Sequence, residues 1–449
     1  MRHAVSLLLL STAGFVQHGR GFMMPLSPPT SETTDGSRRT RLLQRPAAAR
    51  PSARSSSRSS SGGDSVNTSS TASSSSSRGD AGSTGALSFW EGLKMTRGGF
   101  GITASGAALA ALLAGPRPSA AEGAPQKRTV VVTGASSGIG LDTATKLVAM
   151  GHDVHVACRT EAKAKAAAQA SGAAGAFACD LSSLESVRGF ADAWGGKPID
   201  TLCLNAGMAP GTKGTPVYCA EGFEEAVGTN HLGHFLLANL LIKPLEAGSL
   251  RKPRLVVTAS SVHDPDTPGG NQGAKATLGD MSGLERYLAA ADGESKKFDM
   301  VDGGEYNGDK AYKDSKLCNV LFTLEAQRRL SAKKSGVKVD CFSPGLIPSS
   351  GLFRNQNPIF AKIFDFAATN LLKVAANVGQ GGDTLVAMVT DLSLQDGSAG
   401  GRFFATEPGK PQSAFSEQAV SVEAQDVEKG KRLWELSAGC VGLGSKTPI

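Results

Sequence analysis

Apolar residues in this chain gather in short runs that are separated by stretches with helical character. The first run, residues 129–132, is β-branched and is typical of a buried strand. Residues 141–150 follow with a helical pattern. Four more runs predict strands at residues 153–159, 176–181, 199–204 and 255–261. Strands that alternate with helices predict an α/β fold with a doubly wound, mostly parallel sheet.

Residues 1–126 do not share this pattern. Residues 1–22 are predicted to be a signal peptide, because Arg2 and His3 precede a short apolar run. Residues 23–99 are rich in Ser, Thr, Arg and Ala, and this composition predicts a disordered, transit-peptide-like leader. Residues 100–126 hold an apolar segment and a linker. A single catalytic domain is expected from 127 to 449.

The apolar segment at residues 100–114 is short for a membrane span. Three interpretations are open: a thylakoid-type transfer signal, a membrane-surface or half-span anchor, and a part of the transit region.

The positive charge of the chain is confined to this leader. The net charge is +7, and residues 1–126 hold 13 Lys/Arg against 6 Asp/Glu. Residues 127–449 hold 34 of each kind, so the predicted domain is neutral and a nucleic-acid partner is not expected. The seven cysteines form no Cys-x-x-Cys pair. We expect reduced, mostly buried thiols and no metal site.

A glycine-rich turn follows the first predicted strand directly and opens a helix. Glycines at such a turn let the backbone approach a pyrophosphate, which binds at the helix N-terminus. This context predicts a Rossmann-type dinucleotide site. Its expected cofactor-binding residues are Thr133, Gly134, Ser136, Ser137, Gly138, Ile139 and Gly140.

The ends of the next strands supply further candidates. Arg159 ends the second strand where an NAD-binding fold has an acid, and a cation there suits the 2′-phosphate of NADPH. Asp180 and Leu181 end the third strand, and Asp180 is placed to meet the adenine. The fourth strand ends in Asn205, Ala206 and Gly207. Chemistry in such sheets gathers at these carboxyl ends.

Tyr312 and Lys316 are spaced four residues apart. On a helix both side chains share a face. A neighbouring ammonium favours the phenolate and lowers the pKa of a phenol toward the working range. The pair is therefore a candidate for proton transfer.

These motifs together resemble the short-chain dehydrogenase/reductase family over residues 128–350. The resemblance implies that Tyr312 donates a proton and that Lys316 lowers its pKa and holds the nicotinamide ribose. It implies that Ser261, preferred over Ser260 because Val262 follows it, hydrogen-bonds the reacting group or the phenol. Asn230 would anchor a water-linked proton path. His231 and His234 are expected to be packing or capping groups.

The segment between Ser261 and Tyr312 is longer than in most members of that family, and such an insertion usually shapes or covers a site. Residues 310–319, the Leu-Gly-Asp of the insertion, the Leu-Phe-Arg at 352–354 and the tail at 432–437 resemble the light-dependent protochlorophyllide oxidoreductases. Residues that this resemblance assigns to the substrate pocket are Cys318, Leu346 and Phe353.

This resemblance implies hydride transfer from NADPH to carbon 17 of the pigment and proton transfer from Tyr312 to carbon 18, driven by light. Two positions differ from the pattern of that group, which has a tyrosine and a cysteine around the Pro-Gly turn. Here these positions are Ser343 and Leu346. Leucine cannot donate a proton. Either Tyr312 is the only proton donor, or the chain is a divergent paralogue.

Two alternatives are therefore kept. One is a dark NADP(H)-dependent carbonyl or retinoid-type reductase that uses the same tyrosine and lysine. The other is a non-catalytic protein that binds NADPH and pigment.

The leader adds an expected location and partners. A signal peptide followed by a transit tract that begins with Phe22 resembles the leaders of complex algal plastids. The reaction needs stromal NADPH, so we expect the stromal side of the thylakoid or envelope membrane. Association with that membrane surface and a homo-oligomer are further expectations.

Overall fold

The computed structural model describes residues 126–449 except 212–213, 251, 292–295, 351, 353–374, 392–399, 408–409 and 446. The predicted signal peptide, transit tract and apolar segment at residues 100–114 lie outside the described residues, as does Phe353. Within the described part, no helix is both long enough and apolar enough to cross a membrane.

An eight-stranded sheet forms the centre of the domain, in the order β3-β2-β1-β4-β5-β6-β7-β8. Neighbouring strands are parallel except for β8, which pairs antiparallel with β7. The strand order reverses between β1 and β4, and ligands bind at such a switch point. The strands are β1 (Thr129–Thr133), β2 (Asp153–Cys158), β3 (Gly175–Ala178), β4 (Thr201–Leu204), β5 (Arg254–Thr258), β6 (Lys338–Phe342), β7 (Phe403–Ala405) and β8 (Ser416–Gln418).

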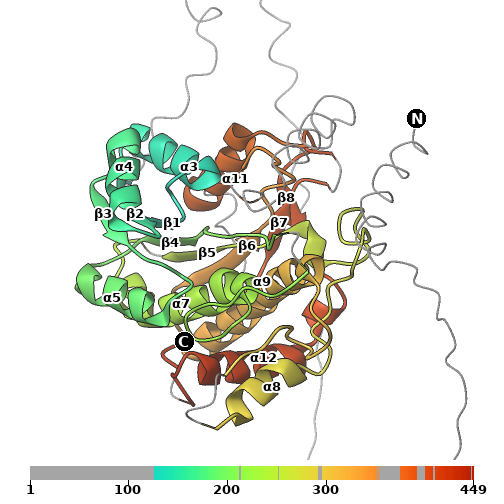
Figure 1. The fold of residues 1–449 in the computed structure, drawn as a ribbon. Helices are drawn as coiled ribbons and strands as arrows, with labels where there is room; N and C mark the ends of the chain where they lie inside the picture. The colour runs from blue at the N-terminus through green and yellow to red at the C-terminus, as the bar shows by residue number, and fades with distance from the viewer. Residues whose placement is uncertain are drawn as a thin grey trace, which may run out of the picture. The chain divides into compact units, whose positions relative to one another are not determined.

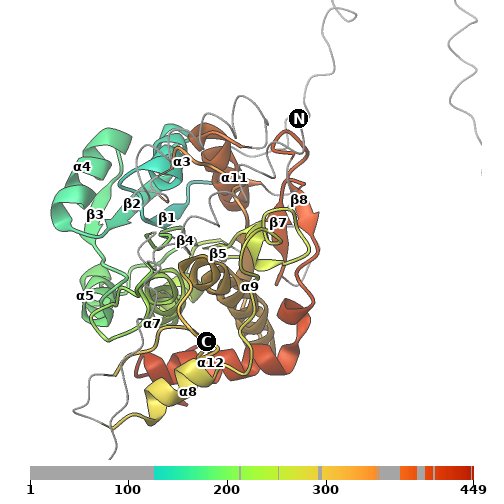
Figure 2. The same ribbon diagram turned by 45° about the vertical axis from the view of Figure 1, so that its right-hand side comes forward.

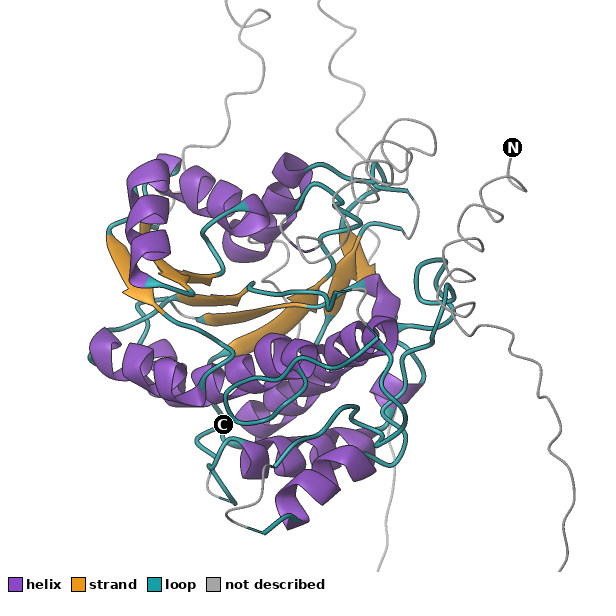
Figure 3. Ribbon diagram, viewed as in Figure 1, coloured by secondary structure: helices purple, strands orange, loops and turns teal. Residues whose placement is uncertain are grey.

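Helices cover both faces of this sheet (Figures 1 and 3). One face carries α3 (Gly138–Ala149), α4 (Glu161–Ser171) and α11 (Val378–Thr390). The other carries α5 (Leu184–Trp194), α7 (Gly233–Glu246) and α9 (Gly308–Ala332). The described residues also form short helical turns: α6 (Glu225–Val227), η1 (Gly228–Leu232), η2 (Ser261–His263) and η5 (Glu423–Gln425).

Two further helices form an outer layer beyond α9. They are α8 (Ser282–Ala289), which belongs to the insertion, and α12 (Val427–Cys440), which contains the tail motif. They lie side by side in both ribbon views (Figures 1 and 2). Arg432 of α12 pairs with Glu285 of α8 at 2.5 Å, and Trp434 stacks on Phe322 of α9 with ring centres 5.7 Å apart. The insertion and the tail therefore pack together against the helix that carries Tyr312.

The predicted fold class and the five predicted strands are confirmed, with ends that shift by one to three residues. Strands β6, β7 and β8 were not predicted. They lie toward one edge of the sheet, where β7 and β8 span only three residues each. All seven cysteines are free and buried, as expected.

The core is densest around the central strands. Leu202 on β4 is fully buried, in a cluster that includes Phe235 of α7 and Leu317 of α9. This cluster holds the second helical layer on the sheet, so its side chains fix the elements that carry the candidate site.

We predict that Leu202→Ala lowers the free energy of unfolding by about 2–5 kcal/mol, because it removes buried methyl groups and leaves a cavity. Urea denaturation of the purified protein measures this change. Leu288→Ala is the control, since Leu288 is 37% exposed. An equal loss in both variants would contradict the assignment of Leu202 to the central core.

Candidate active site

A cleft lies at the carboxyl ends of the strands, where the sheet order reverses. Most of the predicted cofactor residues line it: Gly134, Ser136, Ser137, Gly138, Ile139, Gly140, Arg159, Asp180, Leu181, Asn205, Ala206, Gly207, Tyr312 and Lys316. Residues that were not predicted also line it: Lys163, Cys179, Thr229, Thr258, Ala259, Ser260, Pro344, Gly345, Ile347, Ser350 and Leu352. The cleft thus joins the glycine-rich turn to the Tyr-Lys pair.

The turn between β1 and α3 needs glycine for two reasons. Gly134 and Gly138 have φ of +68° and +58°, which favour glycine. A Cβ at Gly140 would lie 2.6 Å from Nδ2 of Asn205. Ser137, the N-cap of α3, makes no side-chain cap, and the first turn holds no acid. The first amides of this helix are therefore left to an anion such as a pyrophosphate.

Thr133 lies beneath the cleft and does not line it. Its hydroxyl accepts hydrogen bonds from the backbone N–H of Asn205 at 2.9 Å and of Ala206 at 3.0 Å. Nε2 of His234 lies 3.0 Å from the same oxygen, and Nδ1 of His234 lies 3.1 Å from the carbonyl oxygen of Asn230. Burial lowers the pKa of His234 to about 3, so the ring is neutral. Thr133 therefore positions the next strand end.

Two cations stand at the end of β2. Nε of Arg159 lies 3.9 Å from Oδ1 of Asp180, and the Arg159 side chain is 43% exposed. Lys163, in the first turn of α4, also lines the cleft. Arg159 lies before the N-cap Thr160 of α4, so no helical spacing in the sequence pointed to this second cation. Both charges are available to a phosphate at this corner.

The Tyr-Lys pair sits in the first turns of α9. Asn307 caps this helix by accepting a hydrogen bond from the N–H of Lys310 at 3.0 Å. Nζ of Lys316 lies 5.6 Å from the ring centre of Tyr312 and donates to the carbonyl oxygen of Thr258 at 3.3 Å. Lys316 is only 3% exposed. The two side chains share one face of the helix, as their spacing predicts.

Burial controls the proton equilibria of this pair. It lowers the pKa of Lys316 to about 8. It raises the pKa of Tyr312, and a hydrogen bond with Ser260 opposes this only in part. The predicted lowering of the phenol pKa by the Lys316 ammonium is not seen in this structure, where the Ser260 hydrogen bond lowers the pKa and burial outweighs it. Tyr312 keeps its proton at neutral pH, which is the state that a proton donor needs.

The hydroxyl beside the phenol belongs to Ser260, and the preference for Ser261 is corrected. Ser260 lines the cleft and hydrogen-bonds Tyr312. The chain turns into η2 directly after Ser260, and Ser261 does not line the cleft. The backbone of Ser261 is bound elsewhere: its N–H donates to Oγ of Ser343 at 3.2 Å, and its carbonyl oxygen accepts from Thr267 at 2.9 Å. The choice of Ser261 from the identity of the next residue, Val262, did not take this turn into account.

Asn230 lies in the π-helical turn η1 and is fully buried. Its Oδ1 accepts from the N–H of Met208, and its Nδ2 donates to the carbonyl oxygen of Met208 and to Oγ of Ser315, each at 2.9 Å. A Cβ placed on Gly207 would lie 3.5 Å from both Asn230 Oδ1 and Lys316 Nζ. Asn230 thus ties the end of β4 to α9, next to Lys316.

His231, in the same turn, is a buried packing residue. Its Nε2 lies 2.9 Å from Oγ of Ser437 in α12, and burial lowers its pKa to about 4.

The two predicted pocket residues that the structure describes do not line the cleft. Cys318 is fully buried in the core, because it follows Lys316 by two positions and so points to the other side of α9. Leu346 is partly buried, and its neighbours Gly345 and Ile347 line the cleft while it does not. Phe353 lies outside the described residues.

Ser343 has a structural position. Its hydroxyl accepts from the N–H of Ser261 at 3.2 Å and of Gly345 at 3.4 Å. It therefore joins the turn after β6 to the turn after β5.

The described residues contain no group of His, Cys, Asp and Glu that could hold a metal ion.

Comparison with known proteins gives the family. Residues 128–271 match the family model described as short chain dehydrogenase. The chain is 39% identical over 325 residues to the chloroplastic protochlorophyllide reductase of Cucumis sativus, which covers 71% of this chain and 79% of that protein. It is 40% identical over 322 residues to the protochlorophyllide reductase of Avena sativa, with 70% of this chain and 99% of that protein covered.

A solved structure of an uncharacterised protein from Mycobacterium paratuberculosis is 29% identical, covers 71% of this chain and 94% of its own, and gives a TM-score of 0.49. The curated relatives carry the assignment. The chain therefore belongs to the short-chain dehydrogenase/reductase family of NAD(P)-dependent oxidoreductases, as a homologue of the protochlorophyllide reductases.

Proposed function

We propose that this protein reduces protochlorophyllide to chlorophyllide with NADPH in a light-dependent reaction. The observation that carries the proposal is the cleft that joins a dinucleotide turn to Tyr312, Lys316 and Ser260, in a homologue of the protochlorophyllide reductases. A plastid location follows from the relatives named chloroplastic. We place the protein on the stromal side of the thylakoid or envelope membrane, where NADPH is available.

The residues at the strand ends suit NADPH. The uncapped N-terminus of α3 and the close glycine turn would hold the pyrophosphate. Arg159 and Lys163 would bind the 2′-phosphate, and Asp180 would lie at the adenine. When bound, NADPH supplies the hydride that goes to carbon 17 of the pigment.

Tyr312 would deliver the proton to carbon 18. Its raised pKa keeps the phenol protonated, and Ser260 orients the hydroxyl. Lys316, held by the Thr258 carbonyl, would hold the ribose and stabilise the phenolate that remains after the transfer. The reduced bond is a carbon–carbon double bond, which one hydrogen bond polarises weakly, so light absorbed by the pigment would supply the driving force.

The dark carbonyl reductase is the second candidate. A serine hydroxyl beside the phenol, as at Ser260, suits a carbonyl oxygen, and Leu346 removes the thiol expected after the Pro-Gly turn.

A light flash separates the candidates. The purified protein is mixed with NADPH and protochlorophyllide in the dark, and absorbance is recorded before and after the flash. We expect a red shift to chlorophyllide only after the flash. Pigment binding without conversion would support a non-catalytic binding protein. Absence of binding, with dark oxidation of NADPH by a panel of carbonyl compounds, would support the carbonyl reductase.

We predict that Tyr312→Phe lowers turnover at least about 100-fold, because general acid catalysis contributes about 10²–10⁴-fold. NADPH affinity, measured by nicotinamide fluorescence, should remain within about twofold. The adjacent serines give a matched pair: Ser260→Ala should lower turnover and Ser261→Ala should not. Retained turnover in Tyr312→Phe would refute the proton-donor assignment.

We also predict that Arg159→Leu combined with Lys163→Leu weakens NADPH binding about 10- to 100-fold, because hydrogen bonds to a charged phosphate contribute about 1.5–3 kcal/mol. NADH binding should change little. Lys165→Leu is the control, since Lys165 lies in the same helix in an exposed pair with Glu161. An equal loss for NADH and NADPH would contradict a 2′-phosphate site.

A further inference from the structure

The insertion does not form the wall of the cleft in the part of the chain that the structure describes. None of its described residues lines the cleft. Residues 272–278 run instead along the first two turns of α9, and α8 packs with α12 beyond that helix (Figure 2). The described residues of the insertion do not meet the expectation that it shapes or covers the site. We therefore ask what else this segment does.

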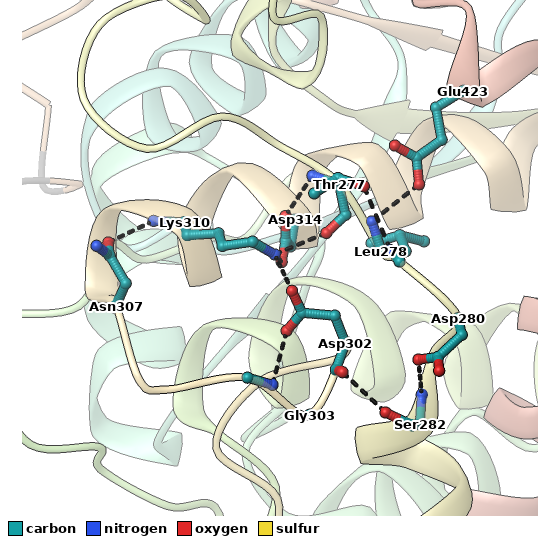
Figure 4. A network of polar contacts seen from close by, with 12 residues as sticks. Thr277, Leu278, Asp280, Ser282, Asp302, Gly303, Asn307, Lys310, Asp314 and Glu423 are labelled. Carbon is teal, nitrogen blue, oxygen red and sulfur yellow. Dashed lines mark hydrogen bonds and ion pairs between the residues drawn. The ribbon is translucent and has the colours of Figure 1, made fainter.

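Two ion pairs of α9 hold this segment by its backbone. Lys310 and Asp314 form the first pair at 2.5 Å. Nζ of Lys310 also donates to the carbonyl oxygen of Thr277 at 2.6 Å, and Oδ1 of Asp314 accepts from the N–H of Thr277 at 3.0 Å. The two polar backbone groups of one residue are thus bound by two side chains of opposite charge (Figure 4).

The second pair repeats this arrangement three residues earlier in the segment. Asp309 and Lys313 pair at 2.9 Å. Nζ of Lys313 donates to the carbonyl oxygen of Ala274 at 2.8 Å, and Oδ2 of Asp309 accepts from the N–H of Ala274 at 3.0 Å. Consecutive i, i+4 pairs therefore clamp Ala274 and Thr277, each by both of its backbone groups. We call these two pairs the double clamp.

The inner pair of the double clamp is built into the protein interior. The side chain of Asp314 has no exposed surface, and that of Lys310 is 15% exposed. Lys310 also lies 3.0 Å from Asp302, whose Oδ1 accepts from the N–H of Gly304 at 3.1 Å (Figure 4). Buried charges of this kind need partners at every position. The inner pair therefore fixes the position at which the insertion contacts α9.

The other end of the segment is tied to the tail. The N–H of Leu278 donates to Oε1 of Glu423 at 2.9 Å (Figure 4). Lys429 of α12 pairs with the same carboxylate at 2.7 Å. Trp434 of α12 lies against Phe322 and Arg329 of α9. The insertion and the tail thus brace one helix.

The position of Tyr312 near the start of α9 explains why these contacts matter. Tyr312 is the fifth residue of α9, in turns whose leading amides have no partners within the helix. Helix ends open more readily than helix centres. Residues 310 and 314 are two positions away from the catalytic residues 312 and 316, so they lie on the opposite side of the helix. The inner pair can therefore hold the helix without touching the substrate.

We propose that Asp309, Lys310, Lys313 and Asp314 are positioning residues for Tyr312. By binding the backbone of the insertion they fix the first two turns of α9, and thereby the place of the phenol. The insertion acts from behind the catalytic helix. This proposal rests on the proposed function only for the substrate used in the turnover assay.

Three variants of the full-length protein test the clamp. Lys310→Met with Asp314→Leu removes both charges of the inner pair, and Asp302, which is 23% exposed, keeps the N–H of Gly304 as a partner. Lys310→Glu with Asp314→Lys keeps an ion pair but presents each charge to the wrong backbone group of Thr277. Glu161→Gln with Lys165→Met removes a matched i, i+4 pair from the surface of α4. Circular dichroism and NADPH fluorescence identify folded protein with intact cofactor binding.

We expect both clamp variants to lower kcat about 10- to 100-fold, the effect of a misplacement of about 1 Å, with NADPH affinity within about twofold. The surface variant should match the wild type. In the presence of NADP⁺, ultraviolet titration of the Tyr312 phenol, identified by comparison with Tyr312→Phe, should move toward the ordinary phenol pKa of about 10 in the clamp variants. Amide exchange in residues 309–317 should accelerate.

Folded clamp variants with wild-type phenol titration and wild-type amide exchange would overturn the proposal. Wild-type kcat in the charge-exchanged variant would also overturn it, because that variant retains the ion pair within α9 but loses the match to the backbone of Thr277 and the contact with Asp302. If the wild-type protein does not convert protochlorophyllide, the proposed function fails. The titration and the exchange measurement still decide the clamp, since they need no pigment.

Discussion

The candidate site depends on keeping the Lys316 ammonium out of water beside a phenol. Burying an ammonium costs free energy unless hydrogen bonds replace its hydration. The carbonyl oxygen of Thr258, at the end of β5, is one such partner at 3.3 Å, and Asn319 donates to the same oxygen at 3.2 Å. Helix α9 must therefore meet β5 at a fixed height. The packing of the sheet, the second helical layer and the turns around the cleft together fix the position of α9 relative to β5.

The cofactor half meets the catalytic half through a short set of close contacts. Thr133, at the end of β1, holds the backbone after β4. His234 lies against both Thr133 and the carbonyl oxygen of Asn230. Asn230 in turn binds the backbone of Met208 and the hydroxyl of Ser315 on α9. A continuous buried chain of polar contacts thus runs from the dinucleotide turn to the catalytic helix. Any residue larger than glycine at position 140 would displace one of its members, Asn205.

The sequence predicts the parts of this arrangement that depend on local pattern. The first five strands follow from apolar runs, and the glycine turn and the Tyr-Lys face follow from spacing. Contacts between distant segments could not be read in this way. Ser260 differs from Ser261 only by the turn into η2, and Cys318 is placed in the core by the direction of α9. Strands β7 and β8 are too short to give a pattern, and Lys163 becomes a cleft residue only because α4 begins beside β2.

Proton supply shows why the catalytic helix needs to be held so firmly. Relative to the light-dependent group, this chain lacks the thiol after the Pro-Gly turn, and Ser343 is engaged in joining two turns. The proposed reaction then relies on one phenol, whose raised pKa makes it a reluctant acid. A reluctant acid transfers its proton efficiently only to an acceptor at hydrogen-bonding distance and in line. Small displacements of Tyr312 would therefore lower the rate of proton transfer in this chain. The insertion and the tail, which lie away from the chemistry, bear on the one helix whose position decides that distance.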